Sequence, residues 1–220
     1  MAREFPQKSP ITFLDQMTGT ISKEIDNILF IGTTLYTNYA LLPNASINDA
    51  LWYAQGRYGI NDFRIGYTRD KNQVRSITPQ DYLRWFIESQ MEITRLVKAN
   101  PHKEIVIITH HCPSPKCCSD GYDLLNTSYA SNLEPFILEH PNIKLWICGH
   151  IHNRKNFKVG NCLVLMNPRG YEHEGEGLGF NPNTFVETTD WSIQTEPLKK
   201  DPQSDRAVFQ ELLKRSCFEL

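Results

Sequence analysis

Four histidines occupy positions in this sequence where they could bind metal. His110 and His111 end the apolar run "VIITHH", and His150 and His152 follow the run "LWICGHIH" with one residue between them. Neutral imidazole is the commonest metal ligand in proteins, and a His-x-His step lets two side chains approach neighbouring metal positions. A single histidine at a strand end is usually a hydrogen-bonded polar residue, but two such pairs together predict a metal site.

The elements around these histidines predict an α/β layer in which they meet. The sequence alternates apolar strands with helices, as the runs "TPQDYLRWFIESQMEITRLVKAN", "EIVIITHH", "SNLEPFILEHP", "IKLWICGH" and "CLVLMNPRGY" indicate. Thr78 and Ser131 are the expected N-caps of the two helices, with Asp81 and Glu134 three residues on. Residues beyond the carboxyl ends of neighbouring parallel strands converge, so we expect one pocket, with Gly149 allowing a sharp backbone turn.

The remaining segments are expected to extend or border this layer. Residues 38–76 are predicted to be loop-rich and to frame the pocket, together with the glycine-rich run "EHEGEGLGF". The other elements expected are strands at "ITFLD", "GTIS", "NILFIGTTLYT" and "FRIGY", a helix at "SINDALWYAQ", a sheet edge at "TFVETTD" and "WSIQTEP", and an amphipathic helix in the tail, residues 201–220.

Composition favours a globular protein in a reducing compartment. Of 220 residues, 40% are apolar and 22% charged, with a net charge of −2. No apolar run approaches the roughly 20 residues of a membrane span, and no basic run suggests nucleic acid. We therefore expect a cytoplasmic protein without a membrane partner or a clear nucleic-acid signal. Six cysteines fit free thiols; a lesser alternative is a zinc cluster of Cys112, Cys117, Cys118 and His111.

Taken together and in order, "VIITHHCPSP", "LWICGHIH" and "LMNPRGY" resemble the C-terminal half of calcineurin-like metallophosphoesterases, in their bacterial and phage-type branch. The Gly-His-x-His element matches the closing signature of that family, and "THHCPSP" matches its preceding metal-binding histidine with a proline turn. The resemblance extends from about residue 10 to 188. It implies a metallophosphoesterase-like layered αββα sandwich, incomplete at the N-terminus, with residues 1–200 as a truncated phosphoesterase domain.

The resemblance also implies roles for individual residues. His110 and His150 would bind the second metal of a dinuclear centre of divalent ions (Mn, Fe, Zn or Mg type), and His152 would bind the first. His111 would stand behind the ligands, and Asn167 and Arg169 would lie at the edge of the site. For Arg169, either a contact to the phosphate of the substrate or a structural brace is open.

Three motifs that complete the site in the family are not found in residues 1–109: Asp-x-His, Gly-Asp followed by Asp, and Gly-Asn-His-Asp/Glu. The catalytic Asn-His acid is thus not among the residues of this sequence. In the family, the segment that carries these three motifs would amount to roughly 60 to 80 residues, at about 30 residues per βαβ unit. Three interpretations fit the lack of these motifs. The chain is a fragment of a longer enzyme, a half that pairs with a complementing N-terminal segment or oligomer, or an inactive copy. In each case we expect an unpaired apolar edge on the sheet.

The expected function is hydrolysis of phosphate monoesters or diesters by a two-metal site that another segment completes. The alternatives are a catalytically inactive module that binds metal or a partner through the same histidines, and a purely structural domain.

Overall fold

The computed structural model describes residues 12–14, 21–70, 73–118, 123–171, 173–174 and 179–195. The chain divides into two compact units, residues 1–180 and residues 181–220, and each is described by itself. The helical tail predicted at 201–220 lies outside the described residues, as do residues 19–20 of the second predicted strand. Of the first, residues 12–14 are described, and they form no strand.

A six-stranded mixed sheet forms the centre of the first unit, in the order β1-β2-β5-β6-β8-β7. The four inner strands, β2 (Ile28–Thr33), β5 (Glu104–Thr109), β6 (Ile143–Cys148) and β8 (Cys162–Met166), run parallel to one another. The outer strands β1 (Ser22–Ile25) and β7 (Lys155–Val159) pair antiparallel with their neighbours. The predicted α/β class is confirmed.

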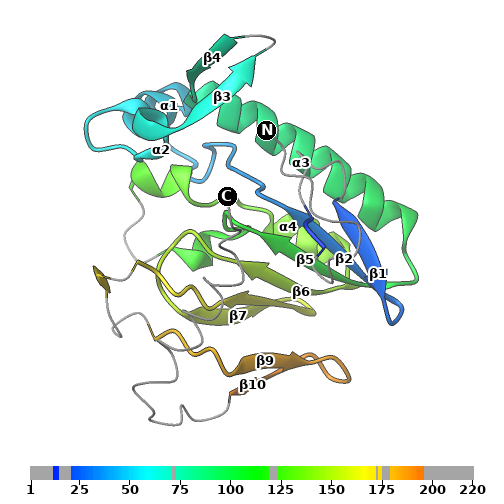
Figure 1. Ribbon diagram of the computed structural model, residues 1–220. Helices are drawn as coiled ribbons and strands as arrows, with labels where there is room; N and C mark the ends of the chain where they lie inside the picture. The colour runs from blue at the N-terminus through cyan, green and yellow to red at the C-terminus, as the bar shows by residue number, and fades with distance from the viewer. Residues whose placement is uncertain are drawn as a thin grey trace, which may run out of the picture. The chain divides into compact units, whose positions relative to one another are not determined.

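Helix α3 (Pro79–Ala99) is the longest element, and its start is the one predicted. The Thr78 hydroxyl accepts a hydrogen bond from the Asp81 N–H, and the Asp81 carboxylate accepts one from the Thr78 N–H at 2.9 Å. This reciprocal pair satisfies two of the amide groups that a helix leaves without partners at its N-terminus. Figure 1 shows α3 lying along the sheet, with α1 (Ile47–Gln55), α2 (Asp62–Ile65), β3 (Tyr67–Asp70) and β4 (Gln73–Ser76) gathered near its N-terminal end.

The main core lies between one face of the sheet and the helices α3 and α4 (Glu134–Glu139). Alternate residues of the inner strands point into it, as the two-residue repeat of a strand requires. Its fully buried members include Ile31, Ile93, Ile107, Ile137 and Trp146. Val106, Leu145 and Leu163 on the opposite face are also buried, so these strands are covered on both faces; in β5, Ile108 is an exposed apolar residue.

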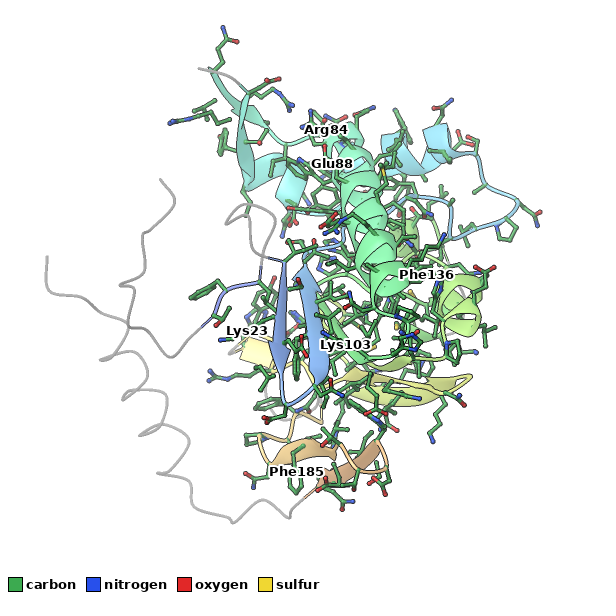
Figure 2. All side chains as sticks on the ribbon, turned by 90° about the vertical axis from the view of Figure 1, so that its right-hand side faces the viewer. Lys23, Arg84, Glu88, Lys103, Phe136 and Phe185 are labelled. Carbon is green, nitrogen blue, oxygen red and sulfur yellow. The ribbon has the colours of Figure 1, made fainter. Side chains whose placement is uncertain are left out.

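The sheet edges correct one prediction. We expected an unpaired apolar edge, but β2 is paired with β1, whose sequence "SKEI" is mostly exposed and polar. Glu24 of β1 forms an ion pair with Lys103, and Lys23 donates a hydrogen bond to the Thr12 hydroxyl at 2.7 Å; Figure 2 shows Lys23 and Lys103 beside the β1–β2 pair. Charged residues on an edge strand disfavour pairing with another sheet.

Two local predictions were wrong, and several strands were not predicted. The run "FRIGY" is divided between the helix α2 and the strand β3 rather than forming one strand, and packing of Phe63 into a second core under α1 fixes the helical turn. Helix α4 is present, but Ser131 does not cap it: the Ser131 hydroxyl accepts from the Asn38 N–H at 3.1 Å, and Ser114 donates to Glu134 at 2.6 Å. Strands β3, β4 and β7 had not been anticipated as separate elements.

In the second unit, β9 (Thr184–Glu187) and β10 (Ser192–Thr195) pair antiparallel with each other. The two strands were predicted correctly, but they form a two-stranded sheet of their own rather than an edge of the six-stranded sheet. Among the described residues, no helix combines the length and the apolar character needed to cross a membrane.

The start of α3 also supports a stability prediction. The Arg75 guanidinium donates to both oxygens of the buried Asp81 carboxylate, at 2.6 and 2.7 Å, and holds the pKa of that carboxyl well below its usual range. We expect Asp81→Asn to lower the free energy of unfolding by roughly 1 to 3 kcal/mol at pH 7, since the cap and the ion pair both weaken. Urea denaturation measures this.

The sign of the pH dependence provides the control. Because the folded-state pKa of Asp81 is depressed, its stabilisation is present above the unfolded-state value near 4 and is lost as the pH falls. The difference between wild type and Asp81→Asn should therefore shrink on acidification. A difference that is the same at pH 7 and at pH 3 contradicts the ion-pair explanation.

Candidate metal centre

Two neighbouring strands place the histidine pairs at one edge of the sheet. His110 and His111 directly follow the end of β5, and His150 and His152 follow the end of β6 after Gly149. Since β5 and β6 are parallel neighbours, their carboxyl ends lie side by side. The His110 Nε2 and His150 Nδ1 atoms are 3.0 Å apart, so the predicted convergence occurs for these two residues.

The spacing of these two nitrogens suits a shared metal ion. Two imidazole nitrogens bound to one ion at about 2.1 Å and at a right angle are roughly 3.0 Å apart. The planes of the two rings are inclined at 70° to each other, with 4.8 Å between centroids. His110 and His150 therefore fit as neighbouring ligands of one ion, and little rearrangement of the rings is needed.

The backbone at His150 is strained. His150 has φ = +63°, in the left-handed region that side chains with a Cβ seldom occupy, whereas Gly149 does not adopt a positive φ. The turn predicted at Gly149 therefore falls one residue later. A Cβ added to Gly149 would lie 3.9 Å from His110, an ordinary contact. Strained residues of this kind concentrate at functional sites, where neighbouring contacts hold them in place.

His152 is held by a carboxylate. Its Nδ1 lies 2.7 and 3.0 Å from the two oxygens of Glu174, and the Tyr171 ring packs edge-on against it at 4.7 Å. A carboxylate that accepts the Nδ1 proton fixes the tautomer of a ligating histidine and leaves Nε2 available for metal. His152 also contributes, after burial and His110, to lowering the pKa of His150, so the two residues lie near each other.

His111 lies behind the pair and is buried. Its Nδ1 lies 3.3 Å from the Thr34 carbonyl oxygen, to which it can donate, and its ring is 4.4 Å from the ring of His150. Within the described parts of the chain, no hydrogen-bond partner is found for Nε2 of His111 or Nε2 of His150. The packing of His111 against His150 suits the supporting role suggested for it.

Two acidic residues near the histidines had not been singled out from the sequence. Asp62, at the start of α2, accepts a hydrogen bond from the Tyr82 hydroxyl, and its charge raises the pKa of His150 against the stronger effect of burial. Glu174 comes from the glycine-rich loop that was expected to frame the pocket. No local pattern could have identified Asp62, because the tertiary packing of Phe63 and Tyr82 brings it there.

Asn167 and Arg169 follow the end of β8, the strand next to β6. Asn167 is half-buried and Arg169 is exposed. Their location at the carboxyl edge of the same sheet is compatible with the predicted position at the rim of the site, and their roles stay predictions.

The charge state of the buried histidines leads to a pH prediction. Burial, followed by the effect of His110, lowers the pKa of His150 to about 4, and burial also places the pKa of His111 well below its ordinary value. Both rings are therefore neutral at pH 7. In the unfolded chain they take up protons near pH 6.5, so acidification from pH 6.5 to 4 favours unfolding, by at most about 1.4 kcal/mol per pH unit for each histidine.

Urea denaturation of the metal-free protein, with a chelator present, should show this loss of stability between pH 7 and pH 5. His150→Asn should have a smaller pH dependence than the wild type over the same interval. An identical dependence in the variant would show that protonation of His150 does not contribute.

Comparisons with known proteins agree with the α/β fold. The sequence profile of the family described as calcineurin-like phosphoesterase matches residues 23–154. The uncharacterized protein L509 of Acanthamoeba polyphaga mimivirus is 30% identical over 172 residues, which cover 74% of this chain and 57% of the viral protein. The 3',5'-cyclic adenosine monophosphate phosphodiesterase CpdA of Escherichia coli K12 is 30% identical over 84 residues, 37% of this chain and 30% of that enzyme.

Among solved structures, phosphopantetheinyl hydrolase (PptH) from Mycobacterium tuberculosis has a TM-score of 0.54 at 14% identity, over 80% of this chain and 57% of that protein. At this identity the likeness concerns the fold alone. The chain spans little more than half the length of the viral relative and about a third of the bacterial enzyme. The profile match covers more than half of the chain and includes the strand ends that carry His110, His111, His150 and His152, and the chain belongs to the calcineurin-like phosphoesterase family.

Proposed function

We propose that this chain supplies the histidine side of a dinuclear metal centre that hydrolyses phosphate esters. His110 and His150 would bind one divalent ion, and His152 would bind the other. The observation that carries the proposal is the 3.0 Å separation of His110 Nε2 and His150 Nδ1 at the ends of two parallel strands. The family supports a phosphoesterase-type activity.

Each of the protein groups has a distinct task in this proposal. Bound divalent ions would polarise the phosphate and lower the pKa of a water molecule so that it can attack phosphorus. His110 and His150 offer neutral nitrogen donors at pH 7, because burial lowers the pKa of His150 to about 4. Glu174 orients the His152 ring, and His111 supports the ring of His150 from behind. Arg169, at the rim, is placed to contact the substrate phosphate or to brace its loop.

Further acidic ligands are needed to balance the charge of two divalent ions. The family motifs that bring them do not occur in residues 1–109 of this sequence. We therefore expect full activity when an N-terminal segment of the family type is supplied, in the same polypeptide or by a partner. The metal identity and the phosphate monoester or diester preference are open; the E. coli relative, by its name, acts on a cyclic phosphodiester.

A chimaera tests the proposal. An N-terminal segment that carries the three family motifs is joined to this chain, and hydrolysis of an aryl phosphate diester is followed with added Mn²⁺. We expect the chimaera to turn over, the chain alone to be at least about a hundredfold slower, and His150→Ala in the chimaera to lose activity by a similar factor. His102→Ala, on an exposed turn, is the matched control.

A folded chimaera that binds Mn²⁺ but hydrolyses neither an aryl monoester nor a diester contradicts the proposal. That result would favour the second possibility, a binding module that uses the same histidines without catalysis. Circular dichroism of the chimaera separates this outcome from a failure to fold.

A further inference from the structure

Three buried cysteines form a second group of potential metal ligands, behind the histidines. The sulfur atoms of Cys112, Cys117 and Cys148 all lie within 4.8 Å of one another. Their residues are 0%, 1% and 4% exposed. The zinc cluster considered from the sequence, with Cys118 and His111, is not the group that the structure assembles: Cys148 takes the place of Cys118.

Two of the thiols, those of Cys112 and Cys117, come from the loop after β5, and the third, that of Cys148, comes from β6; backbone hydrogen bonds hold both segments in place. Cys148 is the last residue of β6. The Cys112 N–H donates to the Tyr129 carbonyl at 3.0 Å, and Cys112 forms an isolated bridge with Ala130. Cys117 ends a short 3₁₀ turn, and its N–H donates to the Ser114 carbonyl at 3.1 Å. The cluster is therefore assembled by the fold before any ligand arrives.

The donor set selects a soft metal ion. Thiolates favour Cu(I), Zn²⁺ and related thiophilic ions over Mg²⁺ or Mn²⁺. A metal bound at about 2.3 Å to three sulfurs in one plane places them roughly 4.0 Å apart. The observed limit of 4.8 Å requires only a small contraction. Lys155 adds a nearby positive charge for the thiolates: its ammonium group donates to the carbonyl of the adjacent Cys118 at 3.1 Å.

We propose that Cys112, Cys117 and Cys148 bind one thiophilic metal ion that is separate from the phosphoesterase metals. The Cys112 thiol also donates to the Gly149 carbonyl at 3.3 Å, so the cluster joins the segment after β5 to the end of β6. These are the two segments that carry His110 and His150. A metal ion bound by these sulfur atoms would cross-link the loop after β5 to the end of β6, and so stabilise the relative position of His110 and His150.

Titration of the reduced protein with Cd²⁺ tests this proposal, because a thiolate bound to Cd²⁺ gives a charge-transfer absorption in the ultraviolet. We expect one equivalent to produce the band. Cys117→Ser should weaken binding by more than about a hundredfold, and its neighbour Cys118→Ser, also buried, should leave it unchanged. Cys148→Ser is a second variant in case the first does not fold, which circular dichroism reveals.

His150→Ala should preserve the band, which distinguishes this site from the histidine centre. Absence of the band in the wild type overturns the proposal. So does a loss caused equally by Cys117→Ser and Cys118→Ser, because that pattern means a general disturbance of the core rather than the loss of one ligand.

Discussion

Replacing His150 by alanine in the chimaera, where acidic ligands complete the site, is expected to weaken the binding of Mn²⁺ by at least about a hundredfold. The reason is geometric: the His150 Nδ1 atom, 3.0 Å from the His110 Nε2 atom, is one of two nitrogens that face each other across the ends of β5 and β6. Alanine leaves His110 as the single imidazole donor to that ion. Mn²⁺ is the suitable probe because it does not favour the buried thiols.

Electron paramagnetic resonance of free Mn²⁺ during a titration measures the affinity. The positive φ of His150 is a complication, because alanine is also strained there. His150→Asn is therefore the second variant: asparagine tolerates the left-handed region but does not provide an imidazole ligand. Both variants should lose affinity, and His102→Ala should retain it. Unchanged affinity in His150→Asn would place the Mn²⁺ elsewhere.

The second large effect is expected at Trp146, in the centre of the main core. Trp146 is fully buried, and its indole Nε1 donates to the Thr109 hydroxyl at 2.9 Å. Replacement by alanine leaves a large cavity, for which roughly 3 to 5 kcal/mol of stability is lost. Trp146→Phe should cost less, because it fills most of the space and loses mainly the hydrogen bond, about 1 kcal/mol.

Trp146→Phe should also affect metal binding at the histidines. The Thr109 hydroxyl that accepts from Trp146 donates in turn to the His111 carbonyl at 2.7 Å. Trp146→Phe should therefore weaken Mn²⁺ binding slightly in a protein that stays folded. Denaturation with urea measures the stability, and Trp52→Ala, at a residue 78% exposed, is the matched control with an expected change within about 0.5 kcal/mol. If Trp146→Ala and Trp52→Ala lose similar amounts of stability, the assignment of Trp146 to the core is contradicted.

The parts of the fold that could be predicted are those with a strong local pattern. The strands β5, β6 and β8 are continuous apolar runs, and α3 has a capping box together with a long helical repeat. Where local signals were weak, tertiary packing decided. The Phe63 ring packs against Tyr82 and sets a helical turn in a run that reads as a strand. Strand β7 alternates half-buried and exposed residues over its first four positions, too short a pattern to stand out.

The site shows the same division. The strand-end histidines and their convergence followed from the α/β alternation, because parallel strands bring their carboxyl ends together. The positive φ of His150 could not be predicted, because the glycine at the preceding position is the more usual place for such a turn. The glycine-rich loop was predicted to frame the pocket, but Glu174 within it was not identified as the partner of His152. The thiol cluster required tertiary structure, because Cys148 is distant in sequence from Cys112 and Cys117 and no spacing rule joins them.

The most direct test of the central claim is a crystal of the chimaera soaked in Mn²⁺, with the anomalous scattering of the metal measured. We expect a peak between His110 Nε2 and His150 Nδ1, about 2.1 to 2.3 Å from each nitrogen. A peak at other residues would contradict the assignment of these histidines to a metal centre. The absence of any peak would also contradict it, provided that crystal contacts leave this edge of the sheet open.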